Sequence, residues 1–260
     1  MPLQQLEKEY RVHVYETGPD GRVNVHSLFN YMQDIAAEHA VLLGYGRDDL
    51  MKNNNFWVLS RMYVTINAWP SLNEKVILRT WPAGVDKMFA IRRYTISGPG
   101  GIQVASASSS WLIVDYDTRR IQRPDEFLKN YSRDNELTAG VPRNPVKLPG
   151  TLTEGYISAP FRVTINDLDI NLHTNNVNYL KWVTDIYDLN FIMNNRPCSV
   201  EINYLAEAIF DDGIVIRRSE DEKEKGFVNH SIIRTGDNRE LCRVRLEWAP
   251  EPFEQDKQYL

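Results

Sequence analysis

The sequence predicts an α+β protein made of two tandem repeats, in each of which an antiparallel sheet wraps around one long helix. Two observations support this fold class. The same order of elements, an alternating strand, a long helix and several further strands, occurs on both sides of a stretch rich in proline and glycine. Short segments also recur at nearly constant spacing, which indicates duplication. The 260 residues are long enough for one large domain or for two units of about 130 residues, and the composition, 42% hydrophobic and 25% charged, is that of a globular protein and does not choose between them.

In the first half, a mostly apolar stripe at helical spacing predicts one long helix, which Ser27 could cap. The stripe consists of Leu28, Met32, Ile35, His39 and Leu42. Alternating residues after this helix predict strands at 57–66, 75–81, 88–97 and 103–114.

The second half repeats the plan. Its helix face is formed by residues at steps of three, four and three, namely Tyr179, Trp182, Ile186 and Leu189. Strands are predicted at 199–209, 213–218, 226–234 and 240–248. One helix followed by a run of antiparallel strands, present twice, corresponds to a double hotdog fold.

The matching segments of the two halves lie at similar sequence offsets. Three pairs of segments match at offsets of 138, 137 and 148 residues: Glu74–Arg79 with Asp212–Arg217, Trp111 with Trp248, and Asn30–Met32 with Asn178–Leu180. The larger helix offset predicts about ten extra residues after the first helix, within Gly44–Asn55. We therefore expect one repeat at 1–134, a linker at 135–160 and a second repeat at 161–260.

Charge and segment type narrow the function. The net charge of −5 argues against a nucleic-acid binder, although a local basic patch could still attract an acidic partner. Because the chain shows no signal-peptide pattern and no stretch of bilayer-spanning length, we expect a cytoplasmic protein without membrane insertion. Cys198 and Cys242 lack metal-type spacing, and we expect both to be reduced and neither to be a nucleophile.

The most informative segment changes from two-residue alternation to helical spacing directly after a histidine. Asp169, Asn171 and His173 alternate with Ile170 and Leu172, so an extended backbone would place the polar three on one side and the apolar pair toward the core. Residues 174–176 follow at the junction, where each could cap a helix start. The unpaired N–H groups of a helix start favour developing negative charge, so this corner is suited to catalysis.

This segment resembles the acyl-acyl-carrier-protein thioesterases of plants and bacteria. Residues 169–182 match the family pattern Asp-x-Asn-x-His-x-Asn-Asn-x-x-Tyr-x-x-Trp, and Tyr204-Leu-Ala-Glu207 is similar to its Tyr-x-x-Glu. Supporting matches in the first half are Trp57–Arg61, Thr80–Pro82 and Asp117–Arg120. The resemblance implies two hotdog repeats in one chain and release of free fatty acid from acyl-carrier protein. It also implies an acyl pocket shaped by the first repeat and chemistry in the second. We expect no metal and no organic cofactor.

Two departures bear on the mechanism. Asn203 stands where the family has the first glutamate of Glu-Tyr-x-x-Glu, and Ala208 stands where the plant enzymes have a cysteine. A cysteine nucleophile is therefore excluded at that position, and the chemistry must use carboxylate, amide and imidazole groups.

We assign Glu207 as the general base for water, assisted by His173, with Asn171 positioning water or the carbonyl and Asp169 orienting Asn171 or His173. Backbone N–H groups near Asn175 and Asn176 would form the oxyanion site. Alternatively, Asp169 or Glu207 could attack the thioester and form a transient anhydride.

The direction of Glu207 presents a difficulty. Val200, Ile202 and Tyr204 alternate onto one face of their strand, which places Glu207 on the other face, away from its own helix. A site at the seam between the repeats, or a bulge near Ala206, would resolve the conflict.

The first half lacks the polar set. Asn24-Val25-His26 echoes Asn171-Leu172-His173 at an offset of 147, but at that offset Arg22 stands in place of Asp169. At the strand offset of 138, Trp69 stands in place of Glu207. We expect only the second repeat to be catalytic.

The sequence leaves open the docking surface for a partner, the class of function and the oligomeric state. Arg119 with Arg120, and Arg217 with Arg218, are candidate docking patches for an acidic carrier protein. An acyl-coenzyme A hydrolase and a non-catalytic acyl-thioester-binding regulatory module are the alternative functions. A homodimer is also left open.

Overall fold

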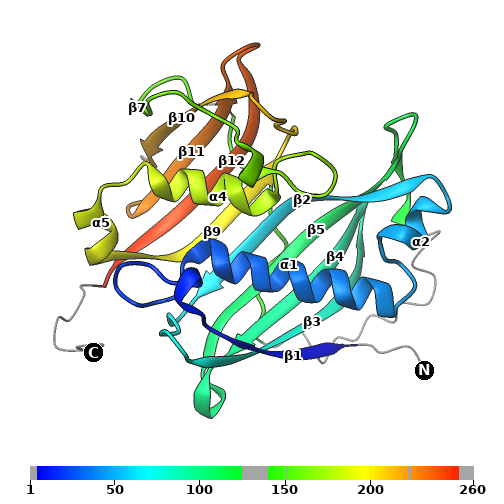
Figure 1. The fold of residues 1–260 in the computed structure, drawn as a ribbon, viewed down its shortest axis with the longest axis horizontal. Coiled ribbons are helices and arrows are strands. Elements are labelled where there is room, and N and C mark those ends of the chain that lie inside the picture. The colour runs from blue at the N-terminus through cyan, green and yellow to red at the C-terminus, as the bar shows by residue number, and fades with distance from the viewer. Residues whose placement is uncertain (1–4, 125–139, 151, 222–223, 252–260) are drawn as a thin grey trace.

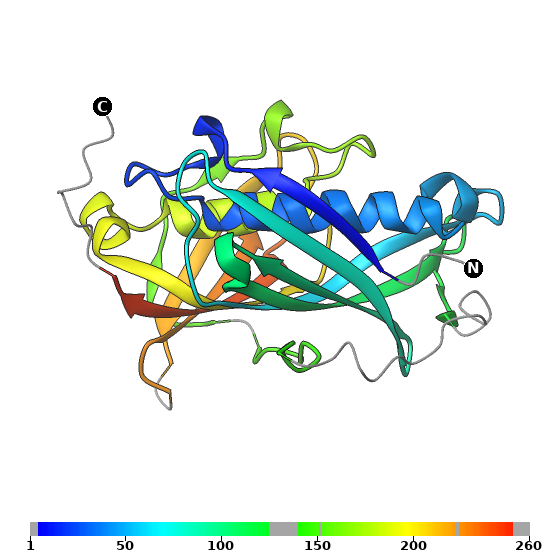
Figure 2. The same ribbon diagram turned by 90° about the horizontal axis from the view of Figure 1, so that it is seen from below.

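A continuous antiparallel sheet carries the two main helices on one of its faces (Figures 1 and 2). The computed structural model describes residues 5–124, 140–150, 152–221 and 224–251. The first repeat contains β1 (Leu6–Arg11), α1 (Val25–Leu42), α2 (Arg47–Met51), β2 (Asn55–Ile66), β3 (Lys75–Asp86), β4 (Phe89–Ser97), β5 (Gln103–Asp115) and β6 (Ile121–Gln122). The second contains β7 (Tyr156–Ile157), β8 (Phe161–Arg162), α4 (Asn176–Asp185), α5 (Leu189–Asn194), β9 (Asn195–Tyr204), β10 (Gly213–Glu220), β11 (Phe227–Arg234) and β12 (Arg239–Pro250).

The two repeats join edge to edge through strands β2 and β9. The strand order is β1-β3-β4-β5-β2-β9-β12-β11-β10-β7, with β6 on β5 and β8 on β10. At the seam Tyr63 pairs with Glu201 in antiparallel register. These two residues are 138 residues apart, which is the strand offset of the duplication. Each therefore pairs with its own equivalent, and a pseudo-twofold axis passes between them.

Both helices bury an apolar face against the sheet. Leu28, Met32 and Ile35 of α1 are at most 1% exposed, and Tyr179 and Trp182 of α4 are buried as predicted. No helix among the described residues has the combination of length and apolarity that a bilayer crossing requires.

Three details of the helix prediction are wrong. Helix α1 begins at Val25 after Asn24, and the Ser27 hydroxyl instead donates to the Glu16 carbonyl. Leu42 lies in the last turn and is 57% exposed. The second helix ends at Asp185, so Leu189 belongs to α5 and faces solvent. Apolar spacing alone did not reveal where each helix begins and ends.

Equivalent hydrogen bonds confirm the duplication. Before each helix the N-cap residue donates its N–H to a carbonyl eight residues earlier, Asn24 to Glu16 and Asn175 to Asp167. We call the turn before each helix, residues 18–24 and 169–175, its corner. Each corner also bonds to the loop that follows a seam strand, which we call the returning loop: Val23 N–H donates to the Pro70 carbonyl after β2, and Thr174 N–H donates to the Ala208 carbonyl after β9.

The matched corners correct the predicted helix register. Asn24 and Asn175 are 151 residues apart, whereas Pro70 and Ala208 are 138 apart. The predicted helix offset of 148 is therefore wrong by three, and the insertion after α1 amounts to 13 residues, the difference between these two offsets. It contains α2, within the predicted segment Gly44–Asn55.

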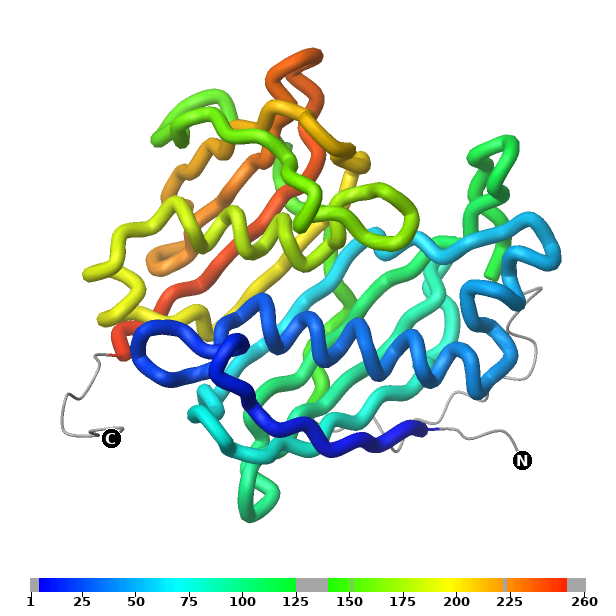
Figure 3. The backbone as a smooth tube through the Cα atoms, in the orientation of Figure 1, coloured from blue at the N-terminus to red at the C-terminus, as the bar shows by residue number. Residues whose placement is uncertain are grey.

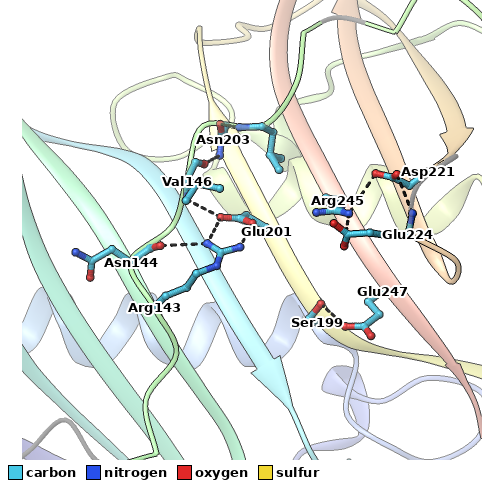
Figure 4. A network of polar contacts seen from close by, with 11 residues as sticks. Arg143, Asn144, Val146, Ser199, Glu201, Asn203, Asp221, Glu224, Arg245 and Glu247 are labelled. Carbon is cyan, nitrogen blue, oxygen red and sulfur yellow. Dashed lines mark hydrogen bonds and ion pairs between the residues drawn. The ribbon is translucent and has the colours of Figure 1, made fainter.

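The described part of the linker crosses the sheet face opposite the helices (Figure 2). Arg143 makes a two-pronged ion pair with Glu201, at 2.7 and 2.9 Å (Figure 4). Its guanidinium also lies 4.3 Å from the Tyr63 ring. Asn203 accepts from the Leu148 N–H at 2.8 Å and donates to the Val146 carbonyl at 3.0 Å. The linker thus contacts both seam strands, β2 through Tyr63 and β9 through Glu201 and Asn203. Glu201 is only 3% exposed and has a charged partner in Arg143.

Candidate active site

Residues 169–173 form a tight turn rather than the predicted extended strand. The Asp169 N–H donates to the His173 carbonyl at 2.8 Å, and Leu172 has a positive φ of 62°. Ile170 and Leu172 are 79% and 72% exposed, so the expectation that they face the core is wrong. A left-handed residue is what reverses the chain here and ends the two-residue alternation.

Asp169 organises this turn. Its Oδ1 accepts from the backbone N–H of Asn171 at 2.8 Å and of His173 at 3.3 Å. Its Oδ2 lies 3.5 Å from the Asn171 side-chain nitrogen. Both carboxylate oxygens of Asp169 therefore contact the turn, and an orienting role for Asp169 stays a prediction.

Glu207 reaches the turn because strand β9 ends early. The N–H groups of Leu205 and Ala206 both donate to the Leu241 carbonyl, the pattern of a β-bulge, and the chain then leaves the sheet. Glu207 Oε2 lies 3.4 Å from His173 Nε2. The bulge considered from the sequence therefore resolves the orientation of Glu207. Glu201 and Asn203 remain on the opposite face, under the linker.

Tyr179 is a positioning residue that the sequence presented only as core. Its hydroxyl accepts from the Ala208 N–H at 2.9 Å and donates to the Ala206 carbonyl at 3.4 Å. The residues on both sides of Glu207 are thus tied to helix α4. Burial raises the pKa of Tyr179, so the hydroxyl stays protonated and can act as donor and acceptor.

The start of α4 offers fewer unpaired backbone N–H groups for an oxyanion site than we expected. Asn175 caps the helix, with Oδ1 accepting from Val177 N–H at 3.1 Å. The N–H of Asn175 donates to the Asp167 carbonyl at 2.8 Å and is already engaged. Asn176 is the first residue of α4, and its N–H has no partner within the helix by the geometry of helix starts. The oxyanion proposal therefore narrows to Asn176.

Arg47 reaches the turn from the first repeat. Its Nη2 lies 3.4 Å from Asn171 Oδ1, and it belongs to α2 within the insertion. The sequence prediction missed this residue. The insertion itself was the available signal, since extra residues in one of two repeats often carry function.

The matching corner of the first repeat contains different side chains. Alignment on the shared hydrogen bonds places Gly18, Asp20, Arg22 and Trp69 at the positions of Asp169, Asn171, His173 and Glu207. The prediction that Arg22 replaces Asp169 is wrong, because it used the offset of 147. His26 lies inside helix α1 and is not part of the corner. That Trp69 stands in place of Glu207 agrees with the structure.

The proposed docking arginines do not form one patch. Arg119 and Arg120 lie after β5, where Arg119 packs 5.4 Å from the rings of Phe56 and Tyr116. Arg217 and Arg218 lie on β10, near the other end of the sheet order. Arg218 lies 4.9 and 4.7 Å from the Tyr156 and Tyr187 rings, so part of this second pair is engaged in packing.

Neither cysteine has the properties of a nucleophile. Burial raises the pKa of the Cys198 thiol to about 11, and Cys242 is fully buried with its pKa raised well above the ordinary value. A thiol needs a lowered pKa to react near neutral pH, so both are structural.

Family models match almost the whole chain. The acyl-ACP thioesterase N-terminal domain matches residues 4–131 and the acyl-ACP thioesterase C-terminal domain matches residues 151–250. This chain belongs to the acyl-ACP thioesterase family. The two matches leave residues 132–150 between them.

Relatives and solved structures resemble this chain over most of its length. A chloroplastic palmitoyl-acyl carrier protein thioesterase of Cuphea hookeriana is 24% identical over 95% of this chain, which spans 62% of that protein's length. An acyl-ACP thioesterase from Bacteroides thetaiotaomicron has a TM-score of 0.81 at 22% identity, covering 95% of this chain and 98% of the other. The 12:0-ACP thioesterase from Umbellularia californica has a TM-score of 0.80 at 21% identity, covering 96% and 99%. These likenesses confirm the double hotdog fold.

Proposed function

We propose that this member of the acyl-ACP thioesterase family hydrolyses the thioester of a fatty acyl group carried on acyl-carrier protein and releases free fatty acid. The meeting of Glu207 and His173 beside the start of α4 carries the proposal. The two residues are 34 positions apart in the chain, and a bulge, a strained turn and Tyr179 bring them together.

In the proposed reaction Glu207 removes a proton from water, and the water oxygen attacks the thioester carbonyl carbon. The negative charge on the carbonyl oxygen is stabilised by the Asn176 N–H and the Asn171 amide. The carbon–sulfur bond then breaks, and the thiolate leaves with a proton returned from the Glu207–His173 pair. Water supplies the hydroxyl of the fatty acid and the proton of the thiol, so the step needs no other reactant.

A covalent route through a mixed anhydride is the second mechanism. Asp169 is engaged by two backbone N–H groups, which favours Glu207 as the attacking carboxylate in that route. Hydrolysis in ¹⁸O-water under single turnover tests the covalent route, because only that route can place label in Glu207. Label appears in the fatty acid if water attacks the thioester directly, and in Glu207 if the anhydride forms and water attacks its enzyme carbonyl.

The deciding experiment compares a chain-length series of acyl groups on acyl-carrier protein and on coenzyme A, with thiol release as the readout. We expect higher kcat/KM on the carrier protein. Preference for coenzyme A would support the alternative hydrolase. Binding of both series without turnover would support the regulatory module and contradict the enzyme.

Carrier docking is proposed at Arg119 and Arg120, with Arg217 and Arg218 as the second candidate. Each pair has one arginine beside aromatic rings, but Arg218 lies closer to them, at 4.7 and 4.9 Å, than Arg119 does, at 5.4 Å. Charge reversal at Arg119 and Arg120 therefore disturbs ring packing less and is tested first. We expect Arg119→Glu with Arg120→Glu to raise KM for carrier-linked substrate and to leave KM for a small thioester unchanged. Equal effects on both substrates would contradict docking at this pair.

A further inference from the structure

One residue of the corner before α4 carries a buried hydroxyl to which the described part of the chain offers no hydrogen bond. Thr174 is 5% exposed, and its Oγ1 has no hydrogen-bond partner among the described residues. Burial takes such a group out of water, so leaving it without a hydrogen bond costs free energy. A buried hydroxyl of this kind therefore points to a ligand or to a cost that the protein accepts for its function.

The first repeat shows that the fold does not require a hydroxyl at this position. In Figure 3 one corner lies before α1 in dark blue and the other before α4 in yellow-green, and we call them the silent corner and the active corner. Val23 of the silent corner is the equivalent of Thr174, because each directly precedes the N-cap residue and donates its N–H to the returning loop. Val23 is fully buried in the core. Both side chains are β-branched, so the active corner has a hydroxyl where the silent corner has a methyl group.

The two residues occupy the same position relative to their helices. A residue directly before an N-cap and the fourth residue of the helix are the positions of the hydrophobic staple. In the silent corner these positions hold Val23 and Leu28, both fully buried and apolar. In the active corner they hold Thr174 and Tyr179, and both of these side chains carry a hydroxyl. The Tyr179 hydroxyl bonds to the backbone on either side of Glu207, whereas the Thr174 hydroxyl has no such bond to a described residue.

The backbone places Thr174 beside the groups that the proposed reaction uses. Thr174 follows His173 in the chain, and its N–H donates at 2.9 Å to the carbonyl of Ala208, the residue after Glu207. Asn176, whose N–H begins α4, is two residues further on. The side chains of His173 and Glu207 are 32% and 50% exposed, whereas Thr174 is buried. Water therefore reaches the corner from the side of Glu207, and the Thr174 hydroxyl lies on the inner side, close to the helix start.

We propose that Thr174 is a further catalytic residue, whose hydroxyl donates a hydrogen bond to the thioester carbonyl oxygen beside the Asn176 N–H. The inference rests on the proposed function, since it adds a donor to the same reaction. A hydrogen bond to an ionised oxygen is stronger than one to a neutral carbonyl, so the hydroxyl stabilises the transition state more than the bound substrate. The proton stays on Thr174 throughout, and no covalent bond forms or breaks at this residue.

The variant Thr174→Val, which introduces the residue found at position 23, tests the hydroxyl. On the acyl-carrier-protein substrate that the wild type hydrolyses fastest, kcat should fall by about 10²-fold, as expected for one lost oxyanion donor. KM should change by less than about threefold, because the lost bond acts mainly in the transition state. The urea midpoint should rise, because a buried hydroxyl without a bond has been removed. A merely structural role would not give a variant that is less active and more stable.

Two further variants serve as controls. Thr174→Ser keeps the hydroxyl and loses only a methyl group, so its kcat should stay within about fivefold of the wild-type value. Val23→Thr makes the reverse exchange in the silent corner, where it buries a hydroxyl in the apolar core. The urea midpoint of Val23→Thr should therefore fall, and its kcat should not change. Thiol release and urea unfolding are measured on the same samples of all four proteins.

The outcomes separate this inference from the proposed function. Wild-type turnover with an unchanged kcat in Thr174→Val would overturn the role of Thr174 alone. An equal loss of kcat in Thr174→Ser would also overturn it, since the hydroxyl would not be the group that matters. A lower urea midpoint in Thr174→Val would show that the hydroxyl is already bonded without substrate and would contradict the inference. No turnover by the wild type would contradict the proposed function and this inference together.

Discussion

The two corners share their backbone and differ in what their side chains face. In the second repeat, Asp169 holds a turn, and Glu207 and His173 meet with half of the Glu207 side chain exposed to solvent. In the first, Asp20 and Arg196 pair with almost no exposure. The turn, the helix start and the returning loop are common to both. The shared backbone therefore carries different side chains, which differ at all four aligned positions, and only the corner of the first repeat is packed by Arg196.

The largest expected effect comes from the base. Glu207→Gln keeps the size of the side chain but removes the charge that accepts a proton, so kcat/KM should fall by about 10²- to 10⁴-fold. The matched variant at the silent corner, Trp69→Phe, should leave turnover unchanged. Steady-state thiol release with circular dichroism measures both. Retention of most activity by folded Glu207→Gln would remove Glu207 from the mechanism.

The second prediction concerns stability. Asp20→Ala leaves the guanidinium of Arg196 buried without its partner, which should lower the free energy of unfolding by about 3–5 kcal/mol. The equivalent change at the exposed active corner, Asn171→Ala, should alter stability by no more than about 0.5 kcal/mol while lowering activity. Urea unfolding and kinetics on the same samples make the comparison. Equal destabilisation by both variants would contradict the described difference.

The third prediction uses pH. Burial, with a smaller contribution from Lys181, lowers the pKa of His26 to about 4. Below its ordinary pKa of about 6.5 the unfolded chain binds a proton that the folded chain does not. Stability should therefore decrease as the pH falls from about 6.5 to 4, by at most about 1.4 kcal/mol per unit.

The variant His26→Gln should remove this part of the pH dependence of unfolding and leave kcat unchanged, because His26 lies inside α1. An activity loss comparable to that of His173→Gln would place His26 in the site after all.

The smallest expected effect is at Arg47. Its contact with Asn171 is long, at 3.4 Å, and exposed, so Arg47→Ala should lower kcat/KM by about two- to fivefold with no change in melting temperature. Arg79→Ala, another exposed arginine of the first repeat, serves as the control. Equal changes in the two variants would show that Arg47 does not position Asn171.

Much of the fold could be predicted because short-range patterns encode it. The strand predicted at 57–66 corresponds to β2 at Asn55–Ile66, and the alternation of Val200, Ile202 and Tyr204 gave the correct inner face of β9. The predicted strand at 199–209 continued too far, because the bulge at Leu205 and Ala206 depends on a carbonyl of another strand, that of Leu241.

The candidate site was predicted as a set of residues but not as a geometry. Asp169, Asn171 and His173 do lie together, although through a turn with Leu172 in a left-handed conformation. Arg47 and Tyr179 were missed as site residues because their contacts join positions far apart in the chain. A cationic or aromatic residue in a helix carries no local signal of such a contact.

The sequence by itself determined the duplication, the alternating strands, the apolar helix faces and the polar set that only the second repeat carries. These follow from residue types at short spacing, which act through local backbone preference and burial. The tertiary structure alone decided which residues of the repeats correspond, that Glu207 turns toward His173, and that Arg196 fills the opposite corner. Those outcomes depend on contacts between distant segments, where backbone hydrogen bonds and the cost of burying charge select one arrangement among many.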